Sequence, residues 1–262
     1  MDYLKTLLVN KINAAWILTL HRPDNRNSIN ETLLKEIHFV LDQAEQDTSC
    51  RCLVFQGENG IFCTGMDFQE VAQPVSGNKE NFDSEEYMRI LKRFTMTSKI
   101  IIVLLDGQVL AGGVGIVAAS DIAISTSHTQ FGLSEALWGL LPACVLPFLI
   151  RRIGFQKSYF MTLTTQTINA TEAKTIGLID ELSDNLNDSL RRLLLRLNRI
   201  QEETVKDLKT YFRKLWIINE TMEQTAVQEI TRLANKPNVQ ANIKNFVEKQ
   251  QFPWETTYKE ML

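Results

Sequence analysis

The sequence predicts an α/β protein, and three of its features point to that class. Short apolar segments of strand length alternate with segments of helical period through the first half of the chain. Residues 99–107, KIIIVLLDG, form a continuous apolar run, as expected for a strand in a sheet that is covered on both faces. From about residue 185 the chain is rich in helix formers with heptad-like leucines and has no strand pattern.

In chain order, the first strand is expected at 15–21 (AWILTLH), and the polar turn RPDNRNS follows it. A helix is expected to begin after Asn30, which can cap it. The apolar residues of this segment then share one helix face: Leu33, Leu34, Ile37, Val40, Leu41 and Ala44. A short buried strand is predicted next at 52–57 (CLVFQG).

The middle of the chain continues this alternation. Residues 74–86 have no hydrophobic period, which predicts a mobile loop, and EEYMRILKRFTMTS after it predicts a helix. Strands are expected at 99–107 and at 121–126 (DIAIST). The strand–helix–strand order favours parallel strands joined by right-handed connections.

Composition narrows the function classes. The chain has 262 residues with a formal net charge of −3 and a pI near 5.7, which argues against nucleic acid or an anionic membrane as the main partner. The first residues lack a signal-peptide pattern, and the longest apolar segment, 136–150, is shorter than the ~20 residues of a membrane span. The four cysteines fit neither a disulfide scaffold nor a zinc site, so we expect a cytoplasmic protein.

The stretch Leu110–Ile124, LAGGVGIVAASDIAI, is the first candidate site. Its adjacent glycines allow a close approach of the backbone to a ligand, and a helix that starts there presents unpaired N–H groups to anionic oxygen. The alternative is a close packing contact between strand and helix that requires small residues.

Two further segments carry candidate groups. In GIFCTGMDFQE (60–70), Gly65 permits an unusual turn before a helix beginning near Met66, and Asp67 is either a functional acid or a first-turn acid favoured by the helix dipole. In FGLSEALWGLLPA (131–143), Glu135 has apolar neighbours, so burial would raise its pKa and suit it to proton transfer. The alternative for Glu135 is a residue at the start of a helix. No metal-ligand spacing, phosphate loop or nicotinamide or flavin fingerprint is present.

Four segments in this order, HRPDNRNSIN, FCTGMDFQEV, VLAGGVGIVAASDIAIS and the stretch from FGLSEALWGLLPA to TINATEAKTIGLID, resemble the crotonase (enoyl-CoA hydratase/isomerase) superfamily over nearly the whole chain. The resemblance implies a spiral of ββα turns that holds the active site, over residues 1–184, and a C-terminal helical region, 185–262, used in trimer formation. A homotrimer is therefore expected, and pairing of trimers into a hexamer is left open.

The resemblance also implies an oxyanion hole, in which two backbone N–H groups hold a thioester oxygen while the α-carbon becomes an enolate. By position these are the N–H groups of Met66 and Gly112, with Gly65 and Gly113 next to the substrate. Typical hydratases of the superfamily carry one glutamate three residues after the oxyanion glycine, where this chain has Gly115, and a second one that this chain keeps as Glu135. A glutamate pair that adds water is thus not expected.

A narrower resemblance joins SEALWGLLPACVLPFLIRRIGFQKSYFMTL and FVEKQQFPWE to the dehydratases of bacterial polyketide β-branching. These lyases remove water from 3-hydroxy-3-methylglutaryl-acyl carrier protein and give the 3-methylglutaconyl thioester. The resemblance implies that Glu135 is general base and acid, that Asp67 is a further polar group at the site, and that no metal or redox cofactor takes part. The substrate would be carried on the phosphopantetheine of an acyl carrier protein, or on CoA.

Four residues of the helix after the predicted loop, Tyr87, Arg89, Lys92 and Arg93, are candidates to meet the free carboxylate of the substrate or the acidic carrier protein. The alternative for them is a solvated helix face. Three other functions stay open: the decarboxylase of the same cassette, a general enoyl-CoA hydratase or isomerase, and a non-catalytic scaffold or RNA-binding protein. Glu135 and the acidic net charge argue against the last of these.

Overall fold

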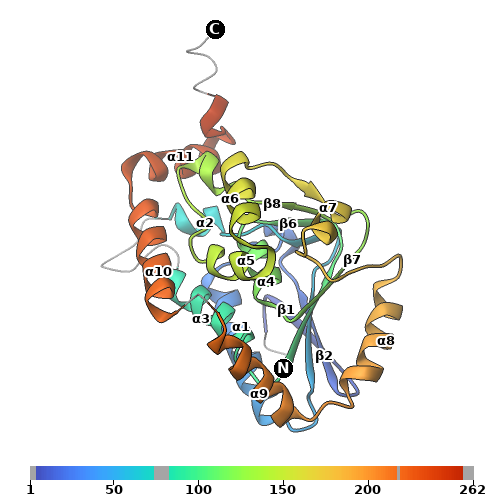
Figure 1. Cartoon of the computed structure of the whole chain (residues 1–262). Helices are drawn as coiled ribbons and strands as arrows, with labels where there is room; N and C mark the ends of the chain where they lie inside the picture. The colour runs from blue at the N-terminus through green and yellow to red at the C-terminus, as the bar shows by residue number, and fades with distance from the viewer. Residues whose placement is uncertain (1–3, 74–82, 217–218, 256–262) are drawn as a thin grey trace.

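Two sheets form the centre of the computed structural model, which describes residues 4–73, 83–216 and 219–255 (Figure 1). The larger sheet has the order β1-β2-β3-β5-β7-β10, and the smaller one has the order β4-β6-β8-β9. The strands of the larger sheet are β1 (Leu7–Ile12), β2 (Ala15–Leu20), β3 (Cys52–Gln56), β5 (Ile100–Leu105), β7 (Ile122–Ser125) and β10 (Glu181–Leu182). Those of the smaller sheet are β4 (Ile61–Cys63), β6 (Gln108–Leu110), β8 (Gln130–Gly132) and β9 (Ile168–Asn169).

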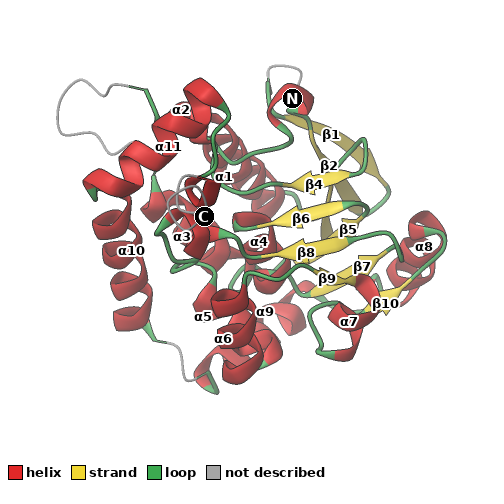
Figure 2. Ribbon diagram, turned by 90° about the horizontal axis from the view of Figure 1, so that it is seen from above, coloured by secondary structure: helices red, strands yellow, loops and turns green. Residues whose placement is uncertain are grey.

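Most helices lie to one side of the two sheets (Figure 2). In chain order they are α1 (Glu31–Gln46), α2 (Phe68–Val71), α3 (Ser84–Phe94), α4 (Gly112–Ala119), α5 (Leu146–Ile153), α6 (Phe155–Thr164), α7 (Ala170–Thr175), α8 (Leu186–Leu197), α9 (Glu202–Lys214), α10 (Glu220–Ala234) and α11 (Pro237–Lys249). Two short 3-10 helices, η1 (Pro23–Asn25) and η2 (Glu135–Trp138), complete the described elements.

The parallel pairing predicted for the larger sheet is confirmed. β2 pairs with β3, β3 with β5, and β5 with β7, all in parallel. All six residues of β5 are buried, as its continuous apolar run predicts. β10 and the strands of the smaller sheet were not predicted, because strands of two or three residues are too short to show a period of two. β1 was not predicted either, because its six residues, LLVNKI, are mostly exposed and do not alternate between buried and exposed.

Local signals account for the helices next to the site. The Asn30 side chain accepts a hydrogen bond from Leu33 N at 2.9 Å, which caps α1 as expected. The predicted apolar face of α1 is buried throughout. Most of the loop expected at 74–86 falls on residues 74–82, which lie outside the described residues, and α3 begins at Ser84 after an Asp83 cap.

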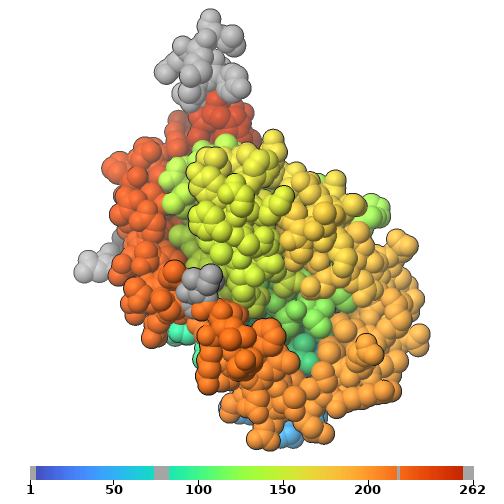
Figure 3. Space-filling model, viewed as in Figure 1, coloured from blue at the N-terminus to red at the C-terminus, as the bar shows by residue number. Residues whose placement is uncertain are grey.

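From Leu186 onward the described elements are helices, as the sequence predicts. In the space-filling view they run from the lower right along the bottom and the left side to the top of the molecule, coloured orange to red (Figure 3). None of the helices in the described ranges combines the length and the apolar character that a membrane span needs.

A buried lysine attaches α9 to the larger sheet. Lys209 Nζ donates to the carbonyl oxygens of Phe94 at 2.8 Å and Lys99 at 2.9 Å, and it lies 2.6 Å from Asp121 Oδ2. The same Asp121 oxygen accepts a hydrogen bond from Ile101 N in β5 at 2.7 Å. A charge that is 6% exposed and has three oxygen partners therefore holds α9 against the larger sheet.

Replacing Lys209 by Met is expected to lower the free energy of unfolding by about 2–4 kcal/mol, because it leaves two carbonyls and the Asp121 carboxylate without their cation. Urea unfolding measures this loss. Lys206→Met on the exposed face of the same helix is the matched control and should change little. Equal effects of the two substitutions would contradict the assigned role of Lys209.

Candidate active site

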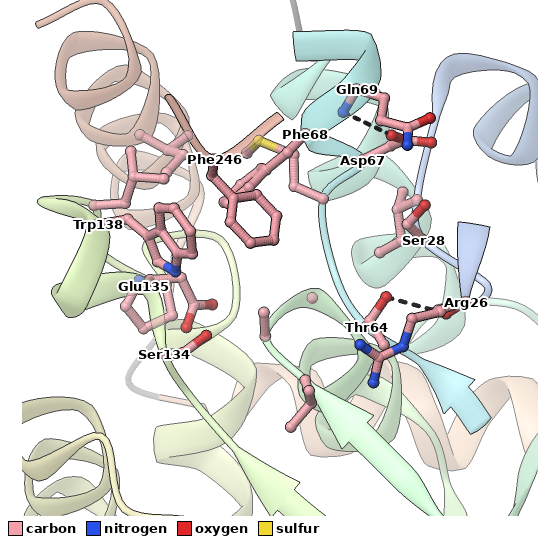
Figure 4. Close-up of a pocket in the computed structure, with 18 of the residues that line it drawn as sticks. Arg26, Ser28, Thr64, Asp67, Phe68, Gln69, Ser134, Glu135, Trp138 and Phe246 are labelled. Carbon is pink, nitrogen blue, oxygen red and sulfur yellow. Dashed lines mark hydrogen bonds between the residues drawn. The ribbon is translucent and has the colours of Figure 1, made fainter. Parts of the chain in front are cut away.

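A pocket of about 430 Å³ lies where segments from five parts of the chain meet (Figure 4). Its walls come from parts of the segments 24–29, 64–69, 110–112, 134–145 and 246–252, together with Tyr87 and Ile230. Glu135, Met66, Asp67 and Gly112 all line it. The three weak sequence signals are thus brought together in one cavity.

Glu135 supplies a buried carboxyl group to the pocket. It is the first residue of η2, and its Oε2 atom is buried and has no hydrogen-bond partner in the described part of the chain. Burial raises the pKa of Glu135 to about 7, while its own backbone N–H acts in the opposite direction. A group with such a pKa exchanges protons readily near neutral pH.

Met66 and Gly112, whose backbone N–H groups are the expected oxyanion donors, both line the same cavity. Met66 lies in a parallel bridge with Ile29, where Ile29 N donates to Gly65 O at 2.7 Å and Asp67 N donates to Ile29 O at 3.0 Å. The bridge thus pairs Ile29 with the carbonyl of Gly65 and the N–H of Asp67, and it leaves Met66 N–H without a bond to Ile29. Among the described residues, neither Met66 N–H nor Gly112 N–H has an acceptor.

The segments that carry these two amides touch each other. Gly65 has a φ of +86°, and a Cβ added to it would lie 3.1 Å from Gly112 N and 2.5 Å from Ala111 Cβ. Only glycine therefore fits at position 65, for reasons of both conformation and space. The residue before Met66 therefore packs directly against Ala111 and Gly112.

Ala111 has a strained backbone at the start of α4. Ala111 follows the last residue of β6, and its N–H donates a hydrogen bond to Gly132 O at 2.8 Å. Its φ of 50° and ψ of −120° turn the chain into the helix that begins at Gly112. Such a conformation costs a non-glycine residue on the order of 1–3 kcal/mol and persists where the surroundings impose it. The Gly112 N–H thus belongs to a turn that the surrounding structure maintains.

The two glycines predicted to contact substrate have a packing role. Gly65 and Gly113 are not among the residues that line the pocket. A Cβ on Gly113 would lie 2.7 Å from Cys63 O, so this glycine allows α4 to pack against β4. The packing interpretation of the glycine-rich stretch therefore holds for Gly113, while Gly112 faces the cavity.

Asp67 lines the pocket, but its carboxylate is fully occupied. Oδ1 accepts hydrogen bonds from Gln69 N at 3.0 Å and Glu70 N at 3.3 Å, and Oδ2 lies 2.7 Å from Arg22 Nη2. It is the N-cap of α2. These contacts favour the alternative given for Asp67, an acid that stabilises the start of a helix, over a catalytic role.

Tyr87 and Lys92 occupy different environments. Tyr87 lines the pocket, is 4% exposed, and donates a hydrogen bond from its hydroxyl to Gly112 O at 2.6 Å. Lys92 does not line the pocket, and its ammonium lies 2.9 Å from Glu223 and 3.5 Å from Glu220 on α10. Its predicted contact with substrate is therefore replaced by a link between α3 and α10.

The two arginines of α3 are likewise paired with carboxylates. Arg93 lies 2.7 Å from Asp42 and 3.0 Å from Glu45, and Arg89 lies 2.7 Å from Glu86. The alternative of a solvated helix face thus fits Arg89, which is exposed, whereas Lys92 and Arg93 are partly buried in ion pairs and Tyr87 is buried.

Sequence reasoning missed an aromatic wall of the pocket. Phe68 and Trp138 meet edge to face with ring centroids 4.8 Å apart, and the Trp138 and Phe246 centroids lie 5.1 Å apart. These rings come from α2, η2 and α11, as Figure 4 shows. No motif joins them, so only the fold brings them together. They supply the apolar surroundings that a buried carboxyl group requires.

Arg26 was also missed. It is the basic residue among the described lining residues, it has a φ of 52°, and its guanidinium donates to Gln108 Oε1. The signal that could have identified it is its position in the polar turn RPDNRNS, because loops often carry binding residues. Within the described ranges, no group of His, Cys, Asp and Glu is arranged to hold a metal ion.

The two sheets, the helices beside them and the pocket have the arrangement expected of a crotonase-type enzyme, and comparison with known proteins agrees. The model of the enoyl-CoA hydratase/isomerase family matches residues 11–257. The chain therefore belongs to the enoyl-CoA hydratase/isomerase family, and the predicted crotonase-like fold is confirmed.

Among its relatives is the bacillaene synthase dehydratase PksH of Bacillus subtilis, which is 40% identical over 91% of this chain and 92% of its own length. The crystal structure of a polyketide biosynthesis enoyl-CoA hydratase (pksH) from Bacillus subtilis has a TM-score of 0.90 and 38% identity, and covers 95% of this chain and 99% of its own. Enoyl-CoA hydratase EchA19 of Mycobacterium tuberculosis is 31% identical over 66% of both chains. These relatives are named as hydratases and dehydratases, so the expectation of a lyase is confirmed.

Replacing Glu135 by Gln is expected to stabilise the protein above neutral pH. The native carboxyl group titrates at about 7 and the unfolded one at 4.5, so between these values the unfolded chain releases a proton that the native protein keeps. Native stability therefore falls as pH rises from 4.5 to 7, by up to about 3 kcal/mol.

Glu135→Gln removes the group that titrates, so the stability of the variant should not fall in this way between pH 4.5 and 7. Urea unfolding measures the free energy of unfolding of both proteins below pH 4.5 and above pH 7. The variant should become more stable relative to the native protein only at the higher pH. The same difference at both pH values would contradict the raised pKa.

Proposed function

We propose that the protein dehydrates 3-hydroxy-3-methylglutaryl-acyl carrier protein to 3-methylglutaconyl-acyl carrier protein in polyketide β-branching. The observation that carries the proposal is a buried carboxyl group without a hydrogen-bond partner on Oε2, in the same cavity as two unpaired backbone amides. A base that titrates near neutral pH and two donors for an oxyanion are the parts that enolate chemistry needs.

In the first step, the ionised Glu135 carboxylate takes the proton from the α-carbon of the thioester. The electron pair of that C–H bond moves to form the enolate, whose oxygen accepts hydrogen bonds from Met66 N–H and Gly112 N–H. Preorganised donors act on the charge that develops there, and removal of one such donor typically costs ~10²–10³ in rate.

In the second step, the enolate collapses, the α,β double bond forms and the C3–O bond breaks. Glu135, now protonated, delivers its proton to the leaving hydroxyl group, so one water leaves and the carboxylate is regenerated. The same group acts as base and then as acid, and the α-proton and the hydroxyl group must therefore leave from one face of the substrate. These steps use only groups of the protein, and no metal or redox cofactor is part of the proposal.

Two features support this substrate class. PksH, with 40% identity, is named as a dehydratase of bacillaene synthase. The substrate has a free carboxylate, and its carrier arm has a phosphate, so the Arg26 guanidinium at the pocket wall offers a cation to an anionic part of the substrate. An acyl carrier protein as the partner and a homotrimer as the assembly are part of the same proposal.

Glu135→Gln should abolish water loss while leaving the fold intact, because the amide keeps the shape of the side chain and cannot accept the α-proton. Intact-protein mass spectrometry of the loaded carrier after incubation measures the product. Glu172→Gln on exposed α7 is the matched control and should retain full turnover.

Near-normal water loss with Glu135→Gln would overturn the assignment. Loss of carbon dioxide from a carrier loaded with 3-methylglutaconyl would instead identify the decarboxylase. Turnover of crotonyl-CoA without turnover of the loaded carrier would identify a general hydratase or isomerase.

The pH dependence of kcat/KM gives a further prediction. Because Glu135 must be ionised to remove the α-proton, kcat/KM should rise with pH and level off above about 7, the pKa of this carboxyl group. Below that value it should fall about tenfold per pH unit. A profile with its midpoint near the ordinary glutamate value of 4.5 would show that Glu135 is not buried as a base.

A further inference from the structure

The Tyr87 hydroxyl lies against the first turn of α4. It donates to Gly112 O at 2.6 Å, and the ring is buried. A Cβ added to Gly115 would lie 2.1 Å from the Tyr87 oxygen, and one added to Gly112 would lie 3.4 Å from it. The glycine at 115 therefore provides the space in which this hydroxyl sits.

The backbone of this turn has little restraint from its own side chains. Ala111 has a positive φ, and Gly112 has no side chain to restrict it. A hydrogen bond to Gly112 O fixes the residue whose N–H faces the pocket. Tyr87 makes this bond from α3, so an element outside the turn restrains it.

We propose that Tyr87 is a positioning residue for the oxyanion hole, which holds the Gly112 amide in place by its hydrogen bond to Gly112 O in the space left by Gly115. The inference rests on the proposed role of the Gly112 N–H. Tyr87 acts through Gly112, and the pair Tyr87 and Gly115 works as one unit.

Burial keeps this hydroxyl protonated. It raises the pKa of Tyr87 well above its ordinary value, and the nearby Glu135 charge acts in the same direction. The other titratable groups that face Tyr87 are the thiols of Cys63 and Cys144, and burial raises the pKa of each to about 12. Tyr87 is thus a constant donor across the working pH range.

The test uses Tyr87→Phe, which keeps the ring and removes only the donor. Two probes are compared: acetoacetyl-pantetheine, which is bound as an enolate and is followed by its ultraviolet absorbance, and butyryl-pantetheine, which cannot form a stable enolate. We expect affinity for the enolate to fall about tenfold and affinity for the butyryl thioester to stay unchanged. In turnover, kcat should fall with little change in KM, and the midpoint of the pH profile should not move.

Gly115→Ala is the second variant. Its methyl group displaces the Tyr87 hydroxyl, so it should cause the same selective loss, and in the Tyr87→Phe background it should add little. Tyr159→Phe on exposed α6 is the matched control and should change neither affinity.

Equal weakening of both probes by Tyr87→Phe would overturn the proposal, because it would indicate a general packing defect. Unchanged binding of both probes, or additive effects of the two substitutions, would overturn it as well. The probe assay does not involve water loss. A protein that fails to dehydrate the loaded carrier but shows the selective loss would refute the proposed function and leave the role of Tyr87 standing.

Discussion

The burial of one carboxyl group is the constraint on which the rest of the pocket depends. Glu135 Oε2 has no hydrogen-bond partner in the described part of the chain, and burial brings its pKa to about 7. A group held in this way costs stability at neutral pH, and the surrounding packing has to offset that cost. The aromatic contacts of Phe68, Trp138 and Phe246 belong to that packing. They join α2, η2 and the C-terminal α11, so the helical region contributes directly to the site.

The opposite wall shows a second constraint, which is the close approach of two backbone segments. Gly65 contacts Ala111 and Gly112, and Ile29 bonds to Gly65 and Asp67 on the other side. Asp67 completes this wall by accepting two amides of α2 and pairing with Arg22. An acid that the sequence suggested for chemistry is thus the N-cap of α2. Positioning of backbone donors matters because they act only when they are aimed at the developing charge.

Sequence patterns predicted the parts of the structure whose signals are local. The Asn30 cap, the apolar face of α1 and the buried run of β5 each depend on residues close together in the chain, and all are confirmed. The short strands β4, β6 and β8 were missed because their positions depend on pairing between distant segments. At the site, too, some residues have a local signal and others depend on contacts between distant segments. Glu135 was recognisable from its apolar neighbours, whereas the pairing of Lys92 with Glu223 and the contact of Tyr87 with Gly112 exist only once α3 has packed against α10 and α4.

The absence of an acid at position 115 has a physical consequence for the proposed chemistry. A side chain at position 115 would meet the Tyr87 hydroxyl, and two carboxylates close to each other shift each other's pKa. In this chain the position next to Gly112 is taken by a neutral hydroxyl, so Glu135 titrates without a carboxylate partner there. One group must then receive the α-proton and return it. An enzyme that relies on a single carboxyl group is suited to an elimination in which both departing groups leave from one face, and the neutral Tyr87 keeps the oxyanion donors aligned without competing for the proton.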